Sequence, residues 1–152
     1  RPLMPALQSI WLTFHVGTAI LSYGSFALAC AISVIYLIDL KRSGEHKILA
    51  APEVSDILSY RVVVFGFLML SIVIISGAIW AQKAWSRYWA WDPKETWSLI
   101  TWIIYAIYLH LRLRKNWRGK SAAWFSISGF VSVIFTFVGV NVLLPSIHSY
   151  VS

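Results

Sequence analysis

Two apolar segments of the chain are joined by residues 79–102, IWAQKAWSRYWAWDPKETWSLITW. Six of the nine tryptophans lie within this stretch, between Trp80 and Trp102. The stretch runs on into an apolar segment that carries His110 near its end. This concentration of indole between two hydrophobic segments predicts an aromatic surface held at one end of a pair of helices.

The composition predicts a membrane protein. Hydrophobic residues make up 59% of the 152 residues and charged residues only 12%, and the apolar runs are long enough to cross a bilayer. Because backbone amides in hydrocarbon must bond within their own segment, each run is expected to be a helix. The four expected helices cover residues 7–38, 62–79, 96–111 and 122–144. We therefore predict an all-α, polytopic membrane protein, a single domain over residues 1–152, with four transmembrane helices and an external Trp-rich amphipathic loop between helices two and three.

Positive charge predicts how these helices are oriented. Nine of the thirteen Lys and Arg residues lie in the connections after the first and third helices, and loops rich in these residues face the cytoplasm. The nine are Lys41, Arg42, Lys47, Arg61, Arg112, Arg114, Lys115, Arg118 and Lys120. The Trp-rich loop and both termini then face the periplasm or the thylakoid lumen. The cations flank helices and form no continuous groove, so the lipid bilayer is the expected partner and nucleic acid is not.

Local sequence marks the start of the third helix. Asp92, Pro93 and Glu95 follow the pattern of an N-cap carboxylate, a proline at the first helical position and an acid three residues after the cap. These residues are therefore expected to shape the helix start. Asp92 is also a candidate binding residue, because it lies between Trp91 and Trp97 in the Trp-rich stretch.

Small residues recur in rows on two of the expected helices. Such rows let neighbouring backbones approach closely, although Gly, Ser and Thr are also common in membrane helices without a packing role. The rows are Gly17, Gly24 and Ala31 in the first helix and Ser128, Ser132 and Thr136 in the last. Cys30 is expected to be a packing residue, since a single cysteine forms neither a disulfide nor a thiolate zinc site within the chain.

The tryptophans exceed what a membrane surface requires. Aromatic belts at the two membrane faces account for Trp11, Trp117 and Trp124. In the surplus, Trp85 and Trp89 stand four residues apart, as on one face of a short amphipathic helix lying on the membrane. Such a face suits the broad apolar ring of a porphyrin. Cations that would pair with the porphyrin carboxylates are Lys83, Arg87 and Lys94.

Three histidines are candidate iron ligands. His15, near the start of the first helix, and His148, beyond the last, are both expected on the side of the Trp-rich loop. Each alone is equally consistent with an ordinary interfacial residue, but two neutral imidazoles on one face are what six-coordinate haem iron requires. His110 lies about 21 Å along the third helix, and an ionisable residue at that depth is a functional candidate. His46, in a charged loop, is expected to be solvated.

The Trp-rich stretch resembles the signature of a known family. WAWDPKETWSLITWIIYAIYLHLR, residues 89–112, is similar to the tryptophan-rich motif of the CcsA/ResC-type cytochrome c assembly proteins of system II. GVNVLLPSIHSY, residues 139–150, resembles the segment that carries one of that family's external histidines. The resemblance covers essentially the whole chain.

The resemblance implies a haem site and its ligands. In that family the tryptophan loop cradles haem on the outer face, two external histidines ligate the iron, and a further histidine helps to hold haem within the membrane. Carried over, His15 and His148 match the external pair, and His110 matches the membrane histidine, which would act with a histidine of a partner. The cofactor implied is haem b. The tryptophans implied in its binding are Trp80, Trp85, Trp89, Trp91, Trp97 and Trp102.

The implied function is haem transport and presentation for covalent attachment to the CXXCH motifs of apocytochrome c. The chain would be the haem-binding half of a cytochrome c synthase, with a CcsB/ResB-type subunit or fused portion as its partner, in a bacterial cytoplasmic or a thylakoid membrane. Family members usually have additional helices ahead of this region. The chain is therefore expected to be the C-terminal core of a longer protein, which agrees with the absence of an initiating Met.

Two other classes of function stay open at the level of sequence. A b-type electron-transfer subunit would hold haem permanently between histidines at matching depths, whereas His110 has no mate at its depth in this chain. A haem-free transporter or scaffold would use the tryptophans only as an interfacial anchor. Soret absorbance of the purified protein would distinguish the hypotheses in which the chain binds haem from the one in which it does not.

Overall fold

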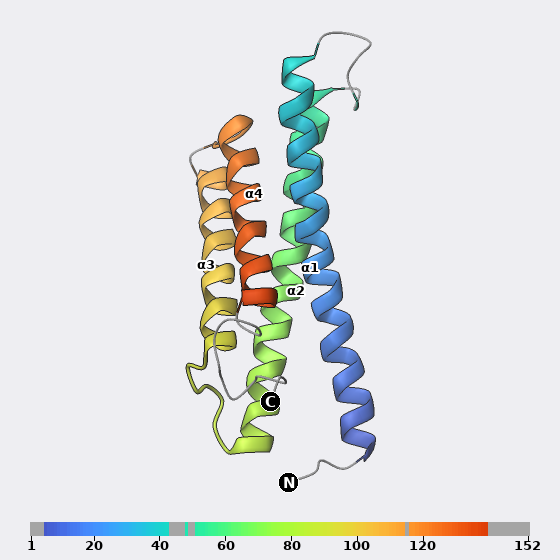
Figure 1. Cartoon of the computed structure of the whole chain (residues 1–152), viewed down its shortest axis with the longest axis vertical. Helices are drawn as coiled ribbons and strands as arrows, with labels where there is room; N and C mark the ends of the chain where they lie inside the picture. The colour runs from blue at the N-terminus through green and yellow to red at the C-terminus, as the bar shows by residue number, and fades with distance from the viewer. Residues whose placement is uncertain (1–4, 43–47, 49–50, 115, 140–152) are drawn as a thin grey trace.

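Four helices run alternately in opposite directions along one axis (Figure 1). The computed structural model describes residues 5–42, 48, 51–114 and 116–139. In chain order the helices are α1 (Pro5–Lys41), α2 (Pro52–Trp85), α3 (Pro93–Arg114) and α4 (Lys120–Ile134), and α4 continues into a π-helical turn, η2 (Phe135–Gly139). The described part of the chain contains no strand, as the composition predicted.

The second helix is longer at both ends than the hydropathy predicted. It begins at Pro52, a residue that suits the first helical turn. Its first turns carry the charged residues Glu53 and Asp56, which lower the mean hydropathy there, so the sequence did not predict this part of the helix. At the other end it runs to Trp85 and stops at Ser86, whose left-handed φ of 60° ends the helix. Residues 86–92 form no helix. The predicted amphipathic helix carrying Trp85 and Trp89 is therefore wrong, since Trp85 ends α2 and Trp89 lies in the non-helical loop.

The outer surfaces of the helices are apolar. Ile10–Lys41 of α1 and Pro52–Trp85 of α2 are each long and hydrophobic enough to cross a membrane. Large aliphatic side chains point outward, among them Ile10 at 74% exposure and Leu113 at 69%. A contiguous apolar surface of this kind is stable against lipid and unstable against water. The chain is a membrane protein.

Close backbone approaches hold the bundle together. Ser22 on α1 donates to the carbonyl oxygen of Gly66 on α2 at 2.9 Å, and a Cβ added at Gly66 would lie 2.8 Å from the Phe26 ring. Phe26 stacks on Tyr105 of α3, with ring centroids 3.8 Å apart. A Cβ at Gly129 of α4 would lie 2.7 Å from the Tyr105 ring. One glycine of α2 and one of α4 therefore make room for this aromatic pair.

The predicted packing row on the first helix is wrong. Gly17, Gly24 and Ala31 are exposed, and a Cβ added at either glycine meets nothing within 4 Å. The row predicted on the last helix is correct in one member, Ser132, which is buried and shares a 3.1 Å hydrogen bond with Thr101 of α3. Glycine and serine thus stand on lipid-facing as well as buried faces, so a row of small residues did not identify the interface.

The ends of α1 and α3 and the starts of α2 and α4 lie toward the same end of the bundle (Figure 1). At that end Arg112 of α3 donates to both carboxylate oxygens of Asp56 on α2, at 2.9 and 2.6 Å, and its side chain is 3% exposed. Its guanidinium also lies 4.7 Å from the centroid of the Tyr60 ring. The backbone N–H of Gly119, just before α4, donates to the same carboxylate at 3.3 Å. This ion pair ties the α3–α4 hairpin to α2.

Candidate functional site

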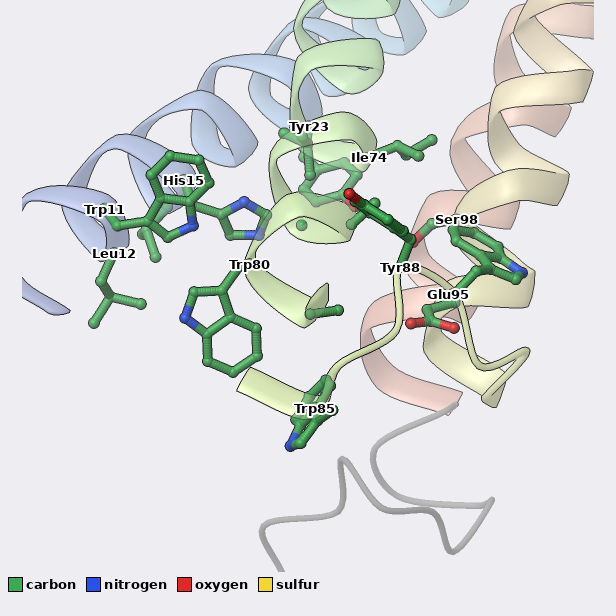
Figure 2. A pocket seen from close by; sticks show the side chains of 16 residues that line it. Trp11, Leu12, His15, Tyr23, Ile74, Trp80, Trp85, Tyr88, Glu95 and Ser98 are labelled. Carbon is green, nitrogen blue, oxygen red and sulfur yellow. The ribbon is translucent and has the colours of Figure 1, made fainter. Parts of the chain in front are cut away.

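A cavity of about 370 Å³ opens at the end of the bundle opposite the basic connections. Its wall combines the first half of α1, the last turns of α2, the loop of residues 86–92 and the start of α3 (Figure 2). This volume lies within the range of small-molecule and cofactor pockets. Its aromatic lining residues are Trp11, Tyr23, Trp80, Trp85, Tyr88 and Trp89.

His15 stands in the wall of this cavity (Figure 2). Its side chain is half-buried, and Nδ1 lies 2.9 Å from Oγ of Ser76 on α2. Gly77 follows Ser76, and a Cβ added there would lie 3.4 Å from Cε1 of His15. A side chain larger than a methyl group at position 77 would therefore press on the imidazole. An imidazole placed among indole rings combines a metal ligand with a surface for a flat apolar molecule.

The tryptophans of the wall meet edge to face. Trp80 and Trp85 have centroids 4.9 Å apart and planes at 87°, and Trp89 and Trp91 have centroids 5.5 Å apart and planes at 86°. The indole N–H groups of Trp11 and Trp89 are buried and form no hydrogen bond with the described residues. A buried donor without an acceptor costs about 1–3 kcal/mol. The wall is therefore suited to a ligand that offers apolar faces and acceptor oxygens.

The loop that carries Trp89 is held by the start of α3. The Asp92 carboxylate accepts the backbone N–H of Glu95 at 2.8 Å, and the Glu95 carboxylate accepts the backbone N–H of Ala90 at 2.8 Å. The predicted N-cap at Asp92 is confirmed. Trp91 adopts a left-handed φ of 57° between these two bonds, which turns its own side chain outward while Trp89 lines the cavity.

Three predicted tryptophans lie outside the cavity. Trp91 is 65% exposed. Trp97 packs on Phe135 of η2, with centroids 4.4 Å apart. Trp102 donates its indole N–H to Ser71 of α2 at 2.9 Å and packs against the hydrophobic core. The last two join α3 to its neighbours, so the structure gives them a packing role.

The predicted cations lie in the segments that surround the cavity, namely the last turn of α2, the loop of residues 86–92 and the first turn of α3. Lys83 is exposed, and its ammonium lies 6.0 Å from the centroid of the Trp11 ring, which itself lines the cavity. Arg87 is exposed in the loop. Lys94 is in the first turn of α3. Positive charge thus accompanies the end of the bundle at which the cavity opens.

The other two candidate histidines are not part of the described cavity. His110 is exposed on α3, about 22 Å along the helix from Glu95 at 1.5 Å per residue. His148 lies outside the described residues, as does His46. Within the described part of the chain no three His, Cys, Asp or Glu side chains gather into a metal site. Of the candidate ligands, the structure places His15 against the indole rings.

Nearly the whole chain matches a known family. The family model described as cytochrome c assembly protein matches residues 1–148.

The chain belongs to the cytochrome c assembly protein family.

Relatives within the cytochrome c assembly family are similar along nearly the whole chain. Three of them, each named cytochrome c biogenesis protein CcsA, come from Chlamydomonas reinhardtii, Guillardia theta and a Synechococcus strain, RCC307, and are 46%, 41% and 38% identical. Each alignment covers 98% of this chain and 43%, 56% and 57% of the relative. The chain therefore spans about half the length of these relatives. The predicted resemblance to CcsA-type proteins is confirmed.

Several cavity residues of this cytochrome c assembly protein were not found from the sequence. Trp11 was assigned to the interfacial belt, yet it lines the cavity beside His15. The signal was present, because residues four apart share one face of a helix. Ser76 and Gly77 gave no such signal, since a serine and a glycine within an apolar helix are common. Tyr88 lay within the Trp-rich stretch and was passed over in favour of its tryptophan neighbours.

Proposed function

We propose that this chain binds haem b at the outer membrane face and presents it for covalent attachment to the CXXCH motifs of apocytochrome c. The observation that carries the proposal is the cavity of about 370 Å³ in which an imidazole, His15, stands among indole rings. Membership of the cytochrome c assembly family and the name of the CcsA relatives support it.

The chemistry of the cavity fits haem at three points. Indole faces such as that of Trp80 provide apolar contact for a porphyrin. The buried N–H groups of Trp11 and Trp89 are donors for which carboxylate oxygens are acceptors, and Lys83 adds positive charge nearby. His15 supplies the imidazole that iron binds. Because the porphyrin itself provides four nitrogen ligands, the protein needs one or two histidines and no cluster of three.

The same proposal names two further histidines, His148 and His110, as haem ligands. His148 would be the second histidine that holds the iron of the outer haem. His110, exposed on α3 toward the basic end, holds a second, inner haem together with a histidine of a CcsB/ResB-type subunit or fused portion. An exposed histidine on a membrane helix is available to such a partner.

The protein provides binding and orientation, and the attachment chemistry belongs to haem and the apocytochrome. Each thiol of the CXXCH motif adds its S–H across a haem vinyl double bond to form a thioether, so no external oxidant or reductant is consumed. The indole wall would hold the macrocycle, and His15 and His148 would hold its iron until the apocytochrome supplies its own histidine.

The proposed topology places all four helices across the membrane. The two basic connections then lie on the cytoplasmic side, since they share one end of the bundle. The cavity and the Trp-rich loop face the periplasm or the thylakoid lumen, where apocytochrome c is matured. In this arrangement haem made in the cytoplasm reaches the cavity through the membrane domain.

Haem titration of the purified chain in lipid nanodiscs tests the proposal. We expect saturable binding with a Soret band typical of histidine-ligated haem. Replacement of Trp80 or Trp89 by leucine removes indole from the cavity wall and should weaken binding by about tenfold or more.

Trp124→Leu is the matched control for these variants. It removes an indole that is 57% exposed on α4, away from the cavity, and should bind haem as the unaltered chain does. Equal affinity of the cavity variants and the control variant would overturn the assignment of the cavity, and the absence of any saturable Soret band would overturn the function.

A further inference from the structure

The hydroxyl of Ser76 contacts two groups at once. Its Oγ lies 2.9 Å from Nδ1 of His15 and 3.2 Å from the backbone carbonyl oxygen of Val73, one turn earlier in α2. Ser76 is 5% exposed and His15 is half-buried. The geometry joins α1 to α2 at the cavity wall.

The two contacts determine which way the hydrogen bonds point. A serine hydroxyl has one proton to donate and two lone pairs to accept with. The Val73 carbonyl oxygen can only accept, so for both contacts to be hydrogen bonds the Ser76 proton must go to it. The bond to His15 is then made by Nδ1–H donating to the Ser76 oxygen. A neutral imidazole protonated at Nδ1 carries its lone pair on Nε2.

We propose that Ser76 is a positioning residue that fixes His15 as the Nδ1–H tautomer, so that Nε2 is the nitrogen presented to haem iron. This inference rests on the proposed function of the cavity. Hydrogen bonds to the second nitrogen of a metal-binding histidine are a general means of setting the tautomer and the ring orientation. Here the acceptor is the Ser76 hydroxyl, which is itself hydrogen-bonded to the backbone of α2. The His15 ring on α1 is therefore held in a fixed position against α2.

The tautomer is tested directly without haem. In chain labelled with ¹⁵N at histidine and placed in nanodiscs, at a pH where His15 is neutral, long-range ¹H–¹⁵N correlation spectra should show His15 protonated at Nδ1. Ser76→Ala should return it to the Nε2–H form that predominates in free histidine. His15→Gln identifies the resonance. Nε2 protonation of His15 in the unaltered chain, or an unchanged tautomer in Ser76→Ala, would overturn the inference.

Haem affinity provides the second measurement. Loss of a hydrogen bond to a metal-binding histidine lowers metal affinity by about 10- to 100-fold, and we expect a loss of this size in Ser76→Ala. Ser76→Thr, which keeps the hydroxyl, should restore the tautomer and most of the affinity. Ser128→Ala is the matched control, because Ser128 is exposed on α4 and its hydroxyl bonds only a backbone carbonyl of its own helix.

The outcomes separate this inference from the proposed function. If the unaltered chain binds no haem while the NMR result holds, the function fails and the tautomer assignment stands. If the chain binds haem through His15 with equal affinity in Ser76→Ala and in the control, the positioning role fails and the function stands.

Discussion

Breaking the Asp56–Arg112 pair should destabilise the bundle at its basic end. Arg112 makes three hydrogen bonds to Asp56, two to the carboxylate and one to the backbone carbonyl oxygen at 3.4 Å. The Arg112 side chain is 3% exposed and that of Asp56 is 13% exposed. Arg112→Met keeps the apolar length of the side chain and removes the charge, so Asp56 remains as a buried anion with the N–H of Gly119 as a donor.

The expected cost follows from this burial. Removing one partner of a buried ion pair costs about 3–5 kcal/mol, because the other charge is left without compensation. The Gly119 donor and the partial exposure of Asp56 place the expected value near the lower limit, about 3 kcal/mol. Asp56→Leu combined with Arg112→Met removes both charges and should recover most of the loss.

Unfolding by SDS in mixed micelles, followed by circular dichroism, measures this difference. Arg114→Met is the matched control, because Arg114 is exposed two residues further along α3; its effect should be below about 0.5 kcal/mol. A loss of less than about 1 kcal/mol in Arg112→Met, the value expected for an exposed ion pair, would refute this prediction. A double variant less stable than Arg112→Met alone would also refute it.

Three further predictions concern the cavity, the helix interface and the loop. Gly77→Leu should fill the cavity beside the imidazole and lower haem affinity by about tenfold or more. Gly77→Ala, whose methyl lies at ordinary contact distance, should bind haem normally. Equal affinities of the two variants in a Soret titration would contradict this prediction. Gly66→Ala should lower the free energy of unfolding by about 1–3 kcal/mol, because its Cβ would meet a buried phenyl ring at 2.8 Å. Gly24→Ala, whose Cβ meets nothing within 4 Å, should leave the free energy of unfolding unchanged or raise it by up to about 1 kcal/mol. The opposite order of stability in SDS unfolding would refute the packing of these two glycines. Asp92→Ala should cost about 1 kcal/mol by removing the acceptor of the Glu95 N–H, measured in the same way, and an unchanged stability would count against the N-cap.

Local chemistry in the sequence was sufficient for part of the site. The capping pattern of Asp92 and Glu95 depends on residues three apart, so it could be identified without a structure, and the bond from the Glu95 N–H to Asp92 confirms the N-cap. The Glu95 carboxylate accepts from the N–H of Ala90, two residues before the cap. The placement of Trp80 and Trp85 near His15 followed from helix direction alone. Antiparallel neighbours bring the start of α1 and the end of α2 to one end of the bundle.

Contacts between distant residues could not be predicted in the same way. The pairing of Asp56 with Arg112 joins positions 56 residues apart, and nothing in the local pattern distinguishes Arg112 from the exposed cations around it. The Ser76 contact to His15 spans 61 residues. Small residues such as Gly24 and Gly66 look alike in sequence, because the difference between them is the side chain on the facing helix.

Electron paramagnetic resonance of the ferric, haem-loaded protein in nanodiscs tests the central claim most directly. A low-spin signal typical of two imidazole ligands is expected for the unaltered chain. In His15→Ala this signal should be replaced by a high-spin signal, and free imidazole, which fits the space left by the side chain, should restore the low-spin form. An unchanged low-spin spectrum in His15→Ala would show that the iron is held elsewhere and would contradict the account.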